Sequence, residues 1–596
     1  TTNNGARSEL RRCSLVRSEH GGVRVSGAGA TSTIEDLTVR ETRGEGGPDS
    51  LVGVGLRVSG AGASATARRV RLEANASRGV LVDAATAELT IGVSAFNRDG
   101  GGTATMNGTL TLRQFLVEEN TPVNLRVASA RLVLDGVRVR ATTAPASAAR
   151  GVELQGGSLE GSHVVIEGSR ELGVLATGDA GVTLTESLVR DTHIAQGGPS
   201  ASGFHAQEGA TATLTRSVLE DNDILALSVR GVGTAHLEDC VIRRTRAVHE
   251  RPPNDSGGRG VEAANGASVT LRRTLVTDNA DIAANASGEG STLTLDHSVI
   301  TNTQARDDGL FGVGLYVGTG ANAAANGSVI AQAQSAGVIV SSGSTLRFAR
   351  GVVRDTRGAD LNGALGQGLV AFNGARVELI DSLLTRNRET GVSCVRTGTT
   401  CTLTDVAITD TQPSHFLNVM QDGFGMGLVA QGASLTARRV AVLRSSGAAI
   451  LSTLLLDEPA GSSLDLQDVF IATVAPQFIR YTAPYGDRVG YGAHVTPGSS
   501  FAASRLVVGD ADFGFFQAGG TLSLSNVVLH GNTTLAGAVA PGISPDATRL
   551  DGVTSLRNSA NEIRREVRAT EASLPLSLPC AQAMNCEPNS ISPRLM

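Results

Sequence analysis

Apolar and polar residues alternate in short bursts along most of the chain, and one phrase recurs at the end of these bursts. The phrase holds a small residue, an apolar pair, two polar residues and a closing Thr or Asn. Copies stand at 187–192 (SLVRDT), 217–222 (SVLEDN), 240–245 (CVIRRT), 274–279 (TLVTDN) and 382–387 (SLLTRN). From Thr192 the closing residues follow at steps of 30, 23, 34 and 24 residues. Such a period predicts a solenoid, in which each repeat buries its apolar side on its neighbours.

Each repeat reads as a single turn of three short strands. The stretch GLVAQGASLTARRVAVLRSS at 427–446 shows bursts of period two that are separated by Gly, Ala and Ser. Period two is typical of strands, and nothing before the C-terminal tail has sustained helical spacing. We therefore predict an all-β parallel coil of about 20 rungs, each spaced about 4.8 Å from the next, in a rod on the order of 90–100 Å long.

The two closing residues predict two kinds of corner. Asn tolerates left-handed backbone, and its amide can bond the next Asn along the coil, so Asn rungs are expected to turn tightly. These residues are Asn75, Asn120, Asn222, Asn279, Asn387 and Asn532. The Thr rungs are instead followed by segments rich in Gly, Pro, Asp, Asn and Ser, which predict loops. They follow Thr192, Thr245, Thr303, Thr356 and Thr411 and should leave along one edge, where binding residues are expected.

The composition fits a narrow coil and limits the classes of binding partner. Among 596 residues there are 73 Gly, aromatics make up 3% and Trp is absent, whereas a wide globular core uses more large rings. A net charge of -6 argues against nucleic acid or an anionic membrane as partner. All basic residues are Arg, so no lysine can act as base or nucleophile. No apolar run is long enough to span a membrane, and the start TTNN, without Met, leads us to expect a mature or trimmed chain.

The six cysteines predict two small disulfide loops. Cys394 and Cys401 flank one short segment, and Cys580 and Cys586 flank another. Neither pair has the CxxC spacing of a zinc site, and two local pairs indicate an oxidising compartment. Cys13 and Cys240 occupy the same place in the phrase and are expected to be buried small residues.

The turn pattern resembles right-handed parallel β-helix proteins of the pectate-lyase-like superfamily, of the secreted or surface type found in bacteria. The resemblance covers about 1–536 and implies the fold. That superfamily includes lyases, hydrolases, esterases, epimerases and adhesins, so it implies no single activity. Asp307-Asp308 forms an acidic pair, but the NTD, RxK and DPHD motifs of its enzymes are absent. No functional residue is therefore carried over.

Metal ligands are sparse in the sequence. The ten His are scattered, without HxH or HExxH, so no zinc site is predicted. Asp307 and Asp308 could form a structural calcium corner, but no Asp-x-Asp-x-Asp series accompanies them, and a solvated acidic loop is the simpler interpretation. We expect no cofactor.

Aromatic residues gather near the C-terminal end, 11 of the 18 Phe and Tyr falling from Phe416 onward. The segment 477–495 is predicted to be the last long loop. Its candidate glycan- or protein-binding residues are Arg480, Tyr481, Tyr485, Asp487, Arg488, Tyr491 and His494. Tyr faces stack on sugars, while Arg and Asp hold hydroxyls or carboxylates. The alternative is that these aromatic residues cover the open end of the coil.

The repeat fades after residue 532, and we place a boundary at 536. Residues 537–596 are predicted to be a capping tail with a short helix over 559–574, since Ser559 and Glu562 form a capping box. Three functions stay open. The first is a non-enzymatic extracellular or surface scaffold that presents its loop edge to a glycan or protein. The others are a lyase or hydrolase of an acidic glycan and a subunit of an envelope or filament assembly.

Overall fold

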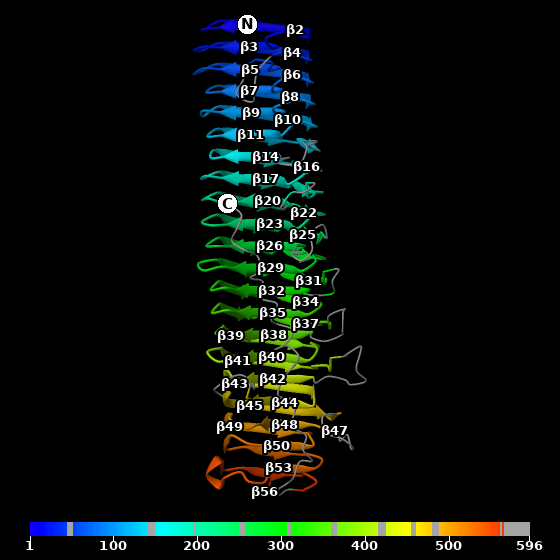
Figure 1. Cartoon of the computed structure of the whole chain (residues 1–596), viewed down its shortest axis with the longest axis vertical. Helices are drawn as coiled ribbons and strands as arrows, with labels where there is room; N and C mark the ends of the chain where they lie inside the picture. The colour runs from blue at the N-terminus through cyan, green and yellow to red at the C-terminus, as the bar shows by residue number, and fades with distance from the viewer. Residues whose placement is uncertain are drawn as a thin grey trace. The chain divides into compact units, whose positions relative to one another are not determined.

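The computed structural model describes residues 1–44, 52–140, 150–195, 198, 201–248, 257–306, 309, 311–358, 366–414, 425–454, 461–478, 488–560 and 563–565. At 477, 478, 488, 489 and 565 only the backbone is described. The chain divides into two compact units, one of residues 1–248 and 256–279 and the other of 249–255 and 280–596. Each unit is a coil of parallel strands, which confirms the predicted all-β class (Figure 1).

In the first unit, successive rungs place their strands on three faces, named A, B and C. Face A holds β1 (Thr2–Asn3), β3 (Val23–Ser26), β5 (Leu56–Ser59), β7 (Val80–Asp83), β9 (Gly102–Thr105), β11 (Val123–Ala128), β14 (Arg150–Gln155), β17 (Leu172–Thr177), β20 (Ser202–Ala206), β23 (Leu225–Arg230) and β26 (Arg259–Ala264). Faces B and C share the long strands β2 (Arg7–Val16), β4 (Thr31–Arg40), β6 (Ser64–Glu73), β8 (Thr86–Ala95) and β10 (Thr109–Glu118). Beyond them face B holds β12 (Arg131–Asp135), β15 (Ser158–Ser162), β18 (Gly181–Thr185), β21 (Thr211–Thr215), β24 (Thr234–Glu238) and β27 (Ser268–Arg272). Face C holds β13 (Arg138–Arg140), β16 (Val165–Glu167), β19 (Leu188–Arg190), β22 (Val218–Glu220), β25 (Val241–Arg243) and β28 (Leu275–Thr277).

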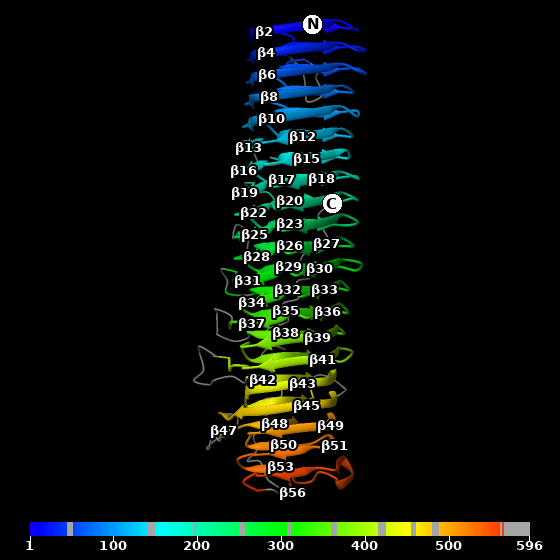
Figure 2. The ribbon, with the colours of Figure 1, turned by 180° about the vertical axis from the view of Figure 1, so that it is seen from behind.

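The second unit repeats this plan (Figure 2). Face A holds β29 (Ile282–Ser287), β32 (Val313–Gly318), β35 (Ala336–Ser341), β38 (Gln367–Phe372), β40 (Thr390–Val395), β42 (Met426–Gln431), β44 (Ala448–Thr453), β48 (Tyr491–Val495), β50 (Phe513–Gln517), β53 (Leu535–Val539) and β56 (Ile563–Arg565). Faces B and C share β39 (Arg376–Thr385), β41 (Thr400–Thr409), β43 (Ser434–Ser446), β45 (Ser463–Ala475) and β49 (Ser500–Gly509). Face B adds β30 (Thr292–Asp296), β33 (Asn322–Asn326), β36 (Thr345–Ala349), β51 (Thr521–Ser525) and β54 (Thr548–Asp551), and face C adds β31 (Val299–Thr301), β34 (Val329–Ala331), β37 (Val352–Arg354), β52 (Val528–His530) and β55 (Thr554–Leu556). A short antiparallel pair, β46 (Gln477–Phe478) with β47 (Arg488–Val489), and one 3-10 turn, η1 (Pro545–Ala547), complete the described elements.

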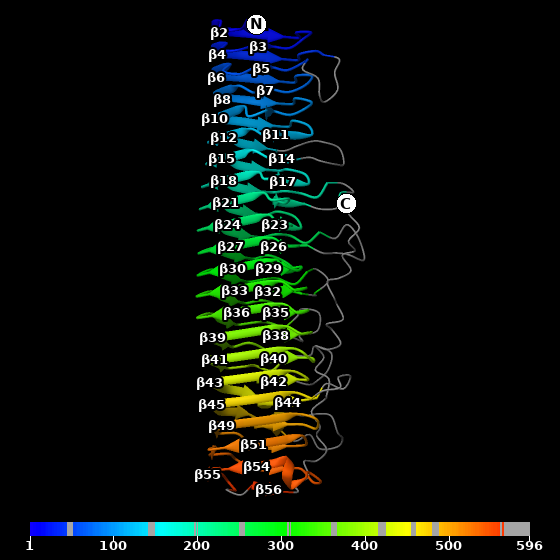
Figure 3. The ribbon, with the colours of Figure 1, turned by 90° about the vertical axis from the view of Figure 1, so that its left-hand side faces the viewer.

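Rungs stack in strict register, so like positions lie over one another (Figure 3). On face A of the first unit, Val174, Phe204, Leu227 and Val261 pair in turn, and each is 0% exposed. Because alternate strand residues point to opposite sides, every second residue enters this narrow core. The apolar bursts of the sequence therefore become continuous interior rows.

The corners use left-handed backbone one residue earlier than predicted. Asn222, Asn279 and Asn387 are not left-handed, but the preceding Asp221, Asp278 and Arg386 have φ of 55°, 56° and 53°. The left-handed residue projects outward, and this turns the Asn side chain into the interior, where each of the three is buried. The predicted role of Asn in the backbone turn is thus wrong, and its role in the interior is hydrogen bonding.

The predicted Asn ladder is present in part, because Asn222, Asn279 and Asn387 bond Thr corners instead of another Asn. Asn75 Nδ2 donates to Asn97 Oδ1 at 2.8 Å, and Asn97 Nδ2 donates to Asn120 Oδ1 at 2.8 Å. In the second unit Asn532 Nδ2 donates to Asn558 Oδ1 at 2.8 Å. These bonds satisfy buried amides that would otherwise cost stability.

Strand pairing continues past residue 536. Strand β53 pairs with β56 through Gly537 and Ile563, and β54 and β55 pair with the rung before them. The coil therefore extends through the predicted tail as far as it is described. A strand at 563–565 also replaces the middle of the predicted helix, because Ile563 pairs into face A instead of lying on a helical stripe. The rest of 559–574 past 565, with Cys580 and Cys586, lies outside the described residues.

Candidate functional site

The loop edge is built on hydrogen bonds between Thr and Asn corners. Thr192, Thr245, Thr303, Thr356 and Thr411 are all 0–2% exposed, at the corner that leads from face C to face A. Asn279 Oδ1 accepts from the Thr245 backbone N–H at 3.0 Å and from its hydroxyl at 2.7 Å. Asn387 Oδ1 accepts in the same way from Thr356, at 3.4 and 3.1 Å. In both units, then, a Thr corner that releases a loop is held by the Asn of the next rung.

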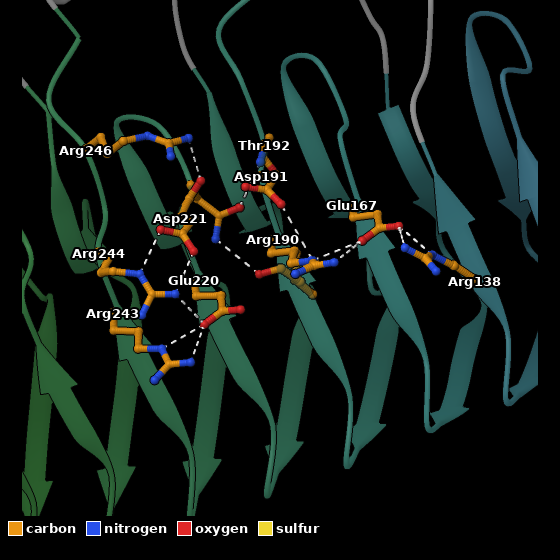
Figure 4. A network of polar contacts seen from close by, with 12 residues as sticks. Arg138, Glu167, Arg190, Asp191, Thr192, Glu220, Asp221, Arg243, Arg244 and Arg246 are labelled. Carbon is orange, nitrogen blue, oxygen red and sulfur yellow. Dashed lines mark hydrogen bonds and ion pairs between the residues drawn. The ribbon is translucent and has the colours of Figure 1, made fainter.

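A network of arginine and carboxylate side chains runs along face C beside this corner (Figure 4). Glu167, 7% exposed at its side chain, lies between Arg138 and Arg190, with Arg190 Nη2 at 2.7 Å. On later rungs Glu220 contacts Arg243 at 2.6 Å and Arg244 at 2.8 Å. Burial opposes ionisation of Glu167, but hydrogen bonds from Arg190 and Arg138 outweigh it and lower its pKa. Glu167 is therefore ionised at neutral pH and is a poor proton donor there.

A second polar cluster lies on the outer side of face A in the first unit, which the sequence reasoning missed. Its signal is the repeated tetrapeptide RGVE, at 150–153 and 259–262. In both copies the Arg pairs with the Glu three residues on: Arg150 with Glu153 at 3.0 Å and Arg259 with Glu262 at 3.1 Å. Each Glu takes a second Arg from another strand, Arg126 at 3.5 Å and Arg230 at 3.0 Å respectively.

His205 lies on the same outer row, between the two RGVE carboxylates. Burial lowers the pKa of His205, and its Nε2 lies 3.1 Å from Gln207 Oε1. Burial would raise the pKa of Glu262, but Arg259 and Arg230 outweigh it and hold that pKa below its usual range. Four rung steps separate Glu153 from Glu262, about 19 Å at 4.8 Å a step. Paired glycosidase carboxylates stand about 5 to 9.5 Å apart, so these two cannot work as an acid and base pair.

Of the predicted aromatic site, Tyr491 and His494 lie on strand β48 and not in a loop. The structure brings them together with ring centroids 4.9 Å apart, and Phe516 lies 5.4 Å from Tyr491 and 5.3 Å from His494. Tyr491 is 3% exposed and His494 is 1% exposed, so neither ring is open to a sugar. Tyr491 and Phe516 belong to an apolar cluster with Met426 and Leu451.

Burial keeps the side chains of His494 and Tyr491 uncharged. It lowers the pKa of His494 to about 4, and neither ring nitrogen has a hydrogen-bond partner. Burial, with a smaller contribution from Asp512, raises the pKa of Tyr491 to about 12. Both are therefore neutral at pH 7. Arg480, Tyr481, Tyr485 and Asp487 lie outside the described residues, and Arg488 is described by its backbone alone, in β47.

The predicted Cys394–Cys401 disulfide is not formed, because both residues are free thiols. They are 0% and 1% exposed. Burial raises the pKa of the Cys401 thiol well above its usual value, and a hydrogen bond with Cys394 adds to the shift. The two sulfurs are thus neighbours in the interior in their reduced form. Cys240 is buried as predicted, whereas Cys13 in the first described rung is only half-buried.

A family profile described as the right handed beta helix region matches residues 150–353 and 254–408. This match agrees with the three-faced parallel coil. The chain is a right-handed parallel β-helix. No curated protein sequence matches this β-helix.

Several solved structures resemble the β-helix at low identity. The catalytic domain of a GH87 alpha-1,3-glucanase in complex with tetrasaccharides is 8% identical, over 75% of this chain and 64% of that one, with a TM-score of 0.28. The A-module of the Azotobacter vinelandii mannuronan C-5 epimerase AlgE4 is 13% identical over 65% and 87%, with a TM-score of 0.24. Vag8, in complex with C1 inhibitor, is 13% identical over 94% and 100%, with a TM-score of 0.29. Such distant likenesses concern the fold alone.

Within the described parts of the β-helix, no three His, Cys, Asp or Glu side chains are grouped as a metal site requires. The acidic pair Asp307-Asp308 lies outside those parts. Among the described residues there is also no helix long and apolar enough to cross a membrane.

Proposed function

We propose that the chain is a non-enzymatic scaffold, acting outside the cell or at its surface, that presents the loops of one edge to a glycan or protein partner. The observation that supports this most is the Thr corner. Each loop-releasing Thr is buried, and Asn279 and Asn387 fix two of them through paired hydrogen bonds. A rigid corner that repeats at the same face holds successive loops at defined spacings.

The state of the carboxylates supports a scaffold over an enzyme. Glu167, Glu220, Glu153 and Glu262 are each paired with two arginines. General acid–base catalysis needs a group that exchanges a proton near the working pH, whereas the neighbouring arginines hold the pKa values of Glu167 and Glu262 below the usual range.

Within this proposal, Tyr481 and Tyr485 are the binding residues to test first. Tyr491 is buried, so its replacement would disturb the core and would not report on binding. The double variant Tyr481→Ala/Tyr485→Ala should lose binding on a glycan array or to cells while its circular dichroism stays unchanged. Thr213→Ala, at an exposed position of face B, is the matched control. Unchanged binding in the double variant would remove the aromatic segment from the proposal.

The RGVE cluster gives a specific reason to test a second function, a lyase or hydrolase of an acidic glycan. Arg126, Arg150, Arg230 and Arg259 lie on one outer face with His205 among them, and guanidinium groups suit sugar carboxylates. Product release from pectin, alginate or chondroitin, lost in His205→Ala, would support an enzyme. No product with any of the three would favour the scaffold.

A further inference from the structure

The outer side of face A in the second unit carries a row of side chains that is buried. Strands β42, β44, β48, β50 and β53 follow one another along the coil (Figure 1). Their register aligns one outward residue of each strand: Val429, Leu451, His494, Phe516 and Ala538. Each of these comes directly after a residue of the interior row, as Phe516 comes after Phe515, and so points to the opposite side. All five are nevertheless only 0–3% exposed.

This outer strip, as we call the five residues, is largely apolar. Val429, Leu451, Phe516 and Ala538 form one cluster of buried residues. The cluster also includes Met426, Ala448, Tyr491 and Leu535 of the same strands. An apolar surface that runs over five rungs on the outside of a coil needs a cover, since a patch of this kind otherwise attracts other chains.

Face B of the same five rungs shows that burial is not a general property of outward residues in this coil. Its outward row pairs in register through Thr436, Asp465, Ala502, Ser523 and Arg549. Thr436 is half-buried and the other four are exposed. The burial of the outer strip therefore has a cause that is particular to face A.

Loops of the same rung do not provide the cover at the end of the strip. Residues 510–512 join β49 to β50, and residues 531–534 join β52 to β53, so both corners are short and fully described. Phe516 and Ala538 on these rungs are as deeply buried as the rest of the strip. Another segment of the chain has to reach them.

The last described strand brings the chain back to the strip. Strand β56 pairs with β53 on face A, with Arg564 opposite Ala538, and Ala560 just before it packs against the apolar cluster. Residues 566–596 follow. Nine extended residues reach about 30 Å, whereas the four steps of the strip span about 19 Å. The chain from Leu574 onward is therefore long enough to lie against any rung of the strip.

The sequence of this segment suits an apolar strip. Residues 572–586 include no charged side chain, and Leu574, Leu576 and Leu578 stand at alternate positions. A proline follows the first and the third leucine, and it restrains the residue before it to extended backbone. Alternate residues of an extended chain lie on one side, so such a segment offers three leucines to one surface.

The internal insertions that flank these strands suit the strip less well. The stretches 415–424, 455–460 and 479–487 all contain charged residues: Asp422, Asp457, Glu458, Arg480 and Asp487. A charge buried against apolar side chains without a partner costs stability. Neither ring nitrogen of the buried His494 has a hydrogen-bond partner, which also favours an apolar cover.

We propose that residues 572–586 dock in extended form on the outer strip, with the three leucines against its apolar cluster. The strip is then a binding site for an extended segment rich in Leu and Pro, and its ligand is part of the same chain. The docked segment shields the apolar side chains of face A from other molecules.

Photo-crosslinking of the full chain tests which segment covers the strip. With p-benzoylphenylalanine in place of Phe516, irradiation followed by mass spectrometry should join position 516 to a peptide from residues 566–596 of the same chain. The same photo-reactive residue in place of Phe470, which is 47% exposed on β45, should give no such product. A product with 415–424, 455–460 or 479–487, a product that links two chains, or no product at all would overturn the proposal.

A charge placed on either side of the segment gives a second test, which needs no photo-reactive residue. Leu576→Asp puts a carboxylate against the apolar cluster and should release the segment, so that fluorescence of the dye anilinonaphthalenesulfonate rises severalfold. Ser577→Asp adds the same charge on the opposite side of the extended segment and should leave the fluorescence at the wild-type level. Equal dye binding by the two variants, with circular dichroism showing both folded, would contradict the docked geometry.

Discussion

Thr245 and Asn279 occupy the same corner on consecutive rungs, and one amide oxygen of Asn279 accepts both the backbone N–H and the hydroxyl of Thr245, at 3.0 and 2.7 Å. Asn279 is fully buried. Thr245 is the last buried residue of its corner before the chain leaves face C, so this pair holds that corner to the next rung.

Asn279→Ala should leave the two Thr245 donors buried without an acceptor, at a cost of about 1–3 kcal/mol. The urea midpoint should fall, and the Thr245 amide should exchange faster with deuterium. Thr277→Ala, two residues earlier on the half-exposed outer side, should change stability by less than about 0.5 kcal/mol. Equal effects of the two variants would contradict the role assigned to the ladder.

His494 should make the fold sensitive to mild acid. Its pKa of about 4 lies below the 6.5 of an unfolded histidine, so the unfolded chain binds a proton that the folded chain refuses. Stability should therefore fall as the pH drops from about 6.5 to 4, by up to about 3 kcal/mol. His494→Phe, which keeps an aromatic ring against Phe516, should remove most of this loss of stability. Urea unfolding at several pH values measures it.

The exposed His236 serves as a control for that measurement. His236→Gln should lose stability at low pH to the same extent as the wild type. If His494→Phe showed the same pH dependence as the wild type, the acid sensitivity would belong to other groups.

Cys394 and Cys401 should resist alkylation in the folded protein. Both are buried, and the raised pKa of Cys401 keeps its thiol protonated. Under reducing conditions, mass spectrometry after brief iodoacetamide treatment should find Cys13 modified first among the four described cysteines, since it is half-buried, and this pair only after denaturation. A Cys394–Cys401 crosslinked peptide from protein kept without reductant would show that the two thiols oxidise to the bond predicted from their spacing.

Gly427 should not tolerate a methyl group. A Cβ there would lie 2.7 Å from the carbonyl oxygen of Ala449 on the next rung and against the Val442 side chain. Gly427→Ala should cost about 1–3 kcal/mol by overpacking. At Gly181 the nearest atom would be 3.7 Å away, so Gly181→Ala should be close to neutral in the same thermal melts. A neutral Gly427→Ala would mean that the rung can shift to make room.

The sequence predicts the rungs well because a short stretch of consecutive residues encodes each rung. The phrase at 187–192 holds its own strand, corner and ladder residue, and the structure has β19 and a buried Thr192 there. Contacts between rungs are harder to predict, since insertions of unequal length hide the register. The RGVE pair is four rungs apart on face A yet more than 100 residues apart in the chain.

Burial explains the remaining differences. Tyr491 and His494 are predicted to lie in the last long loop, but pairing of their strand with β44 and β50 buries both. The left-handed corner was assigned to Asn because Asn accepts that geometry, whereas the interior amide bonds require Asn one residue later. In both cases contacts with the neighbouring rung determine where the side chain lies.

The outward left-handed residue at each corner has a consequence for how such a chain changes over time. Asp221, Asp278 and Arg386 hold the turn by their backbone, while their side chains extend away from the interior. A substitution at such a position changes the charge of the surface without altering the packing of the interior. The coil can therefore acquire new charge patterns, and with them new partners, one corner at a time.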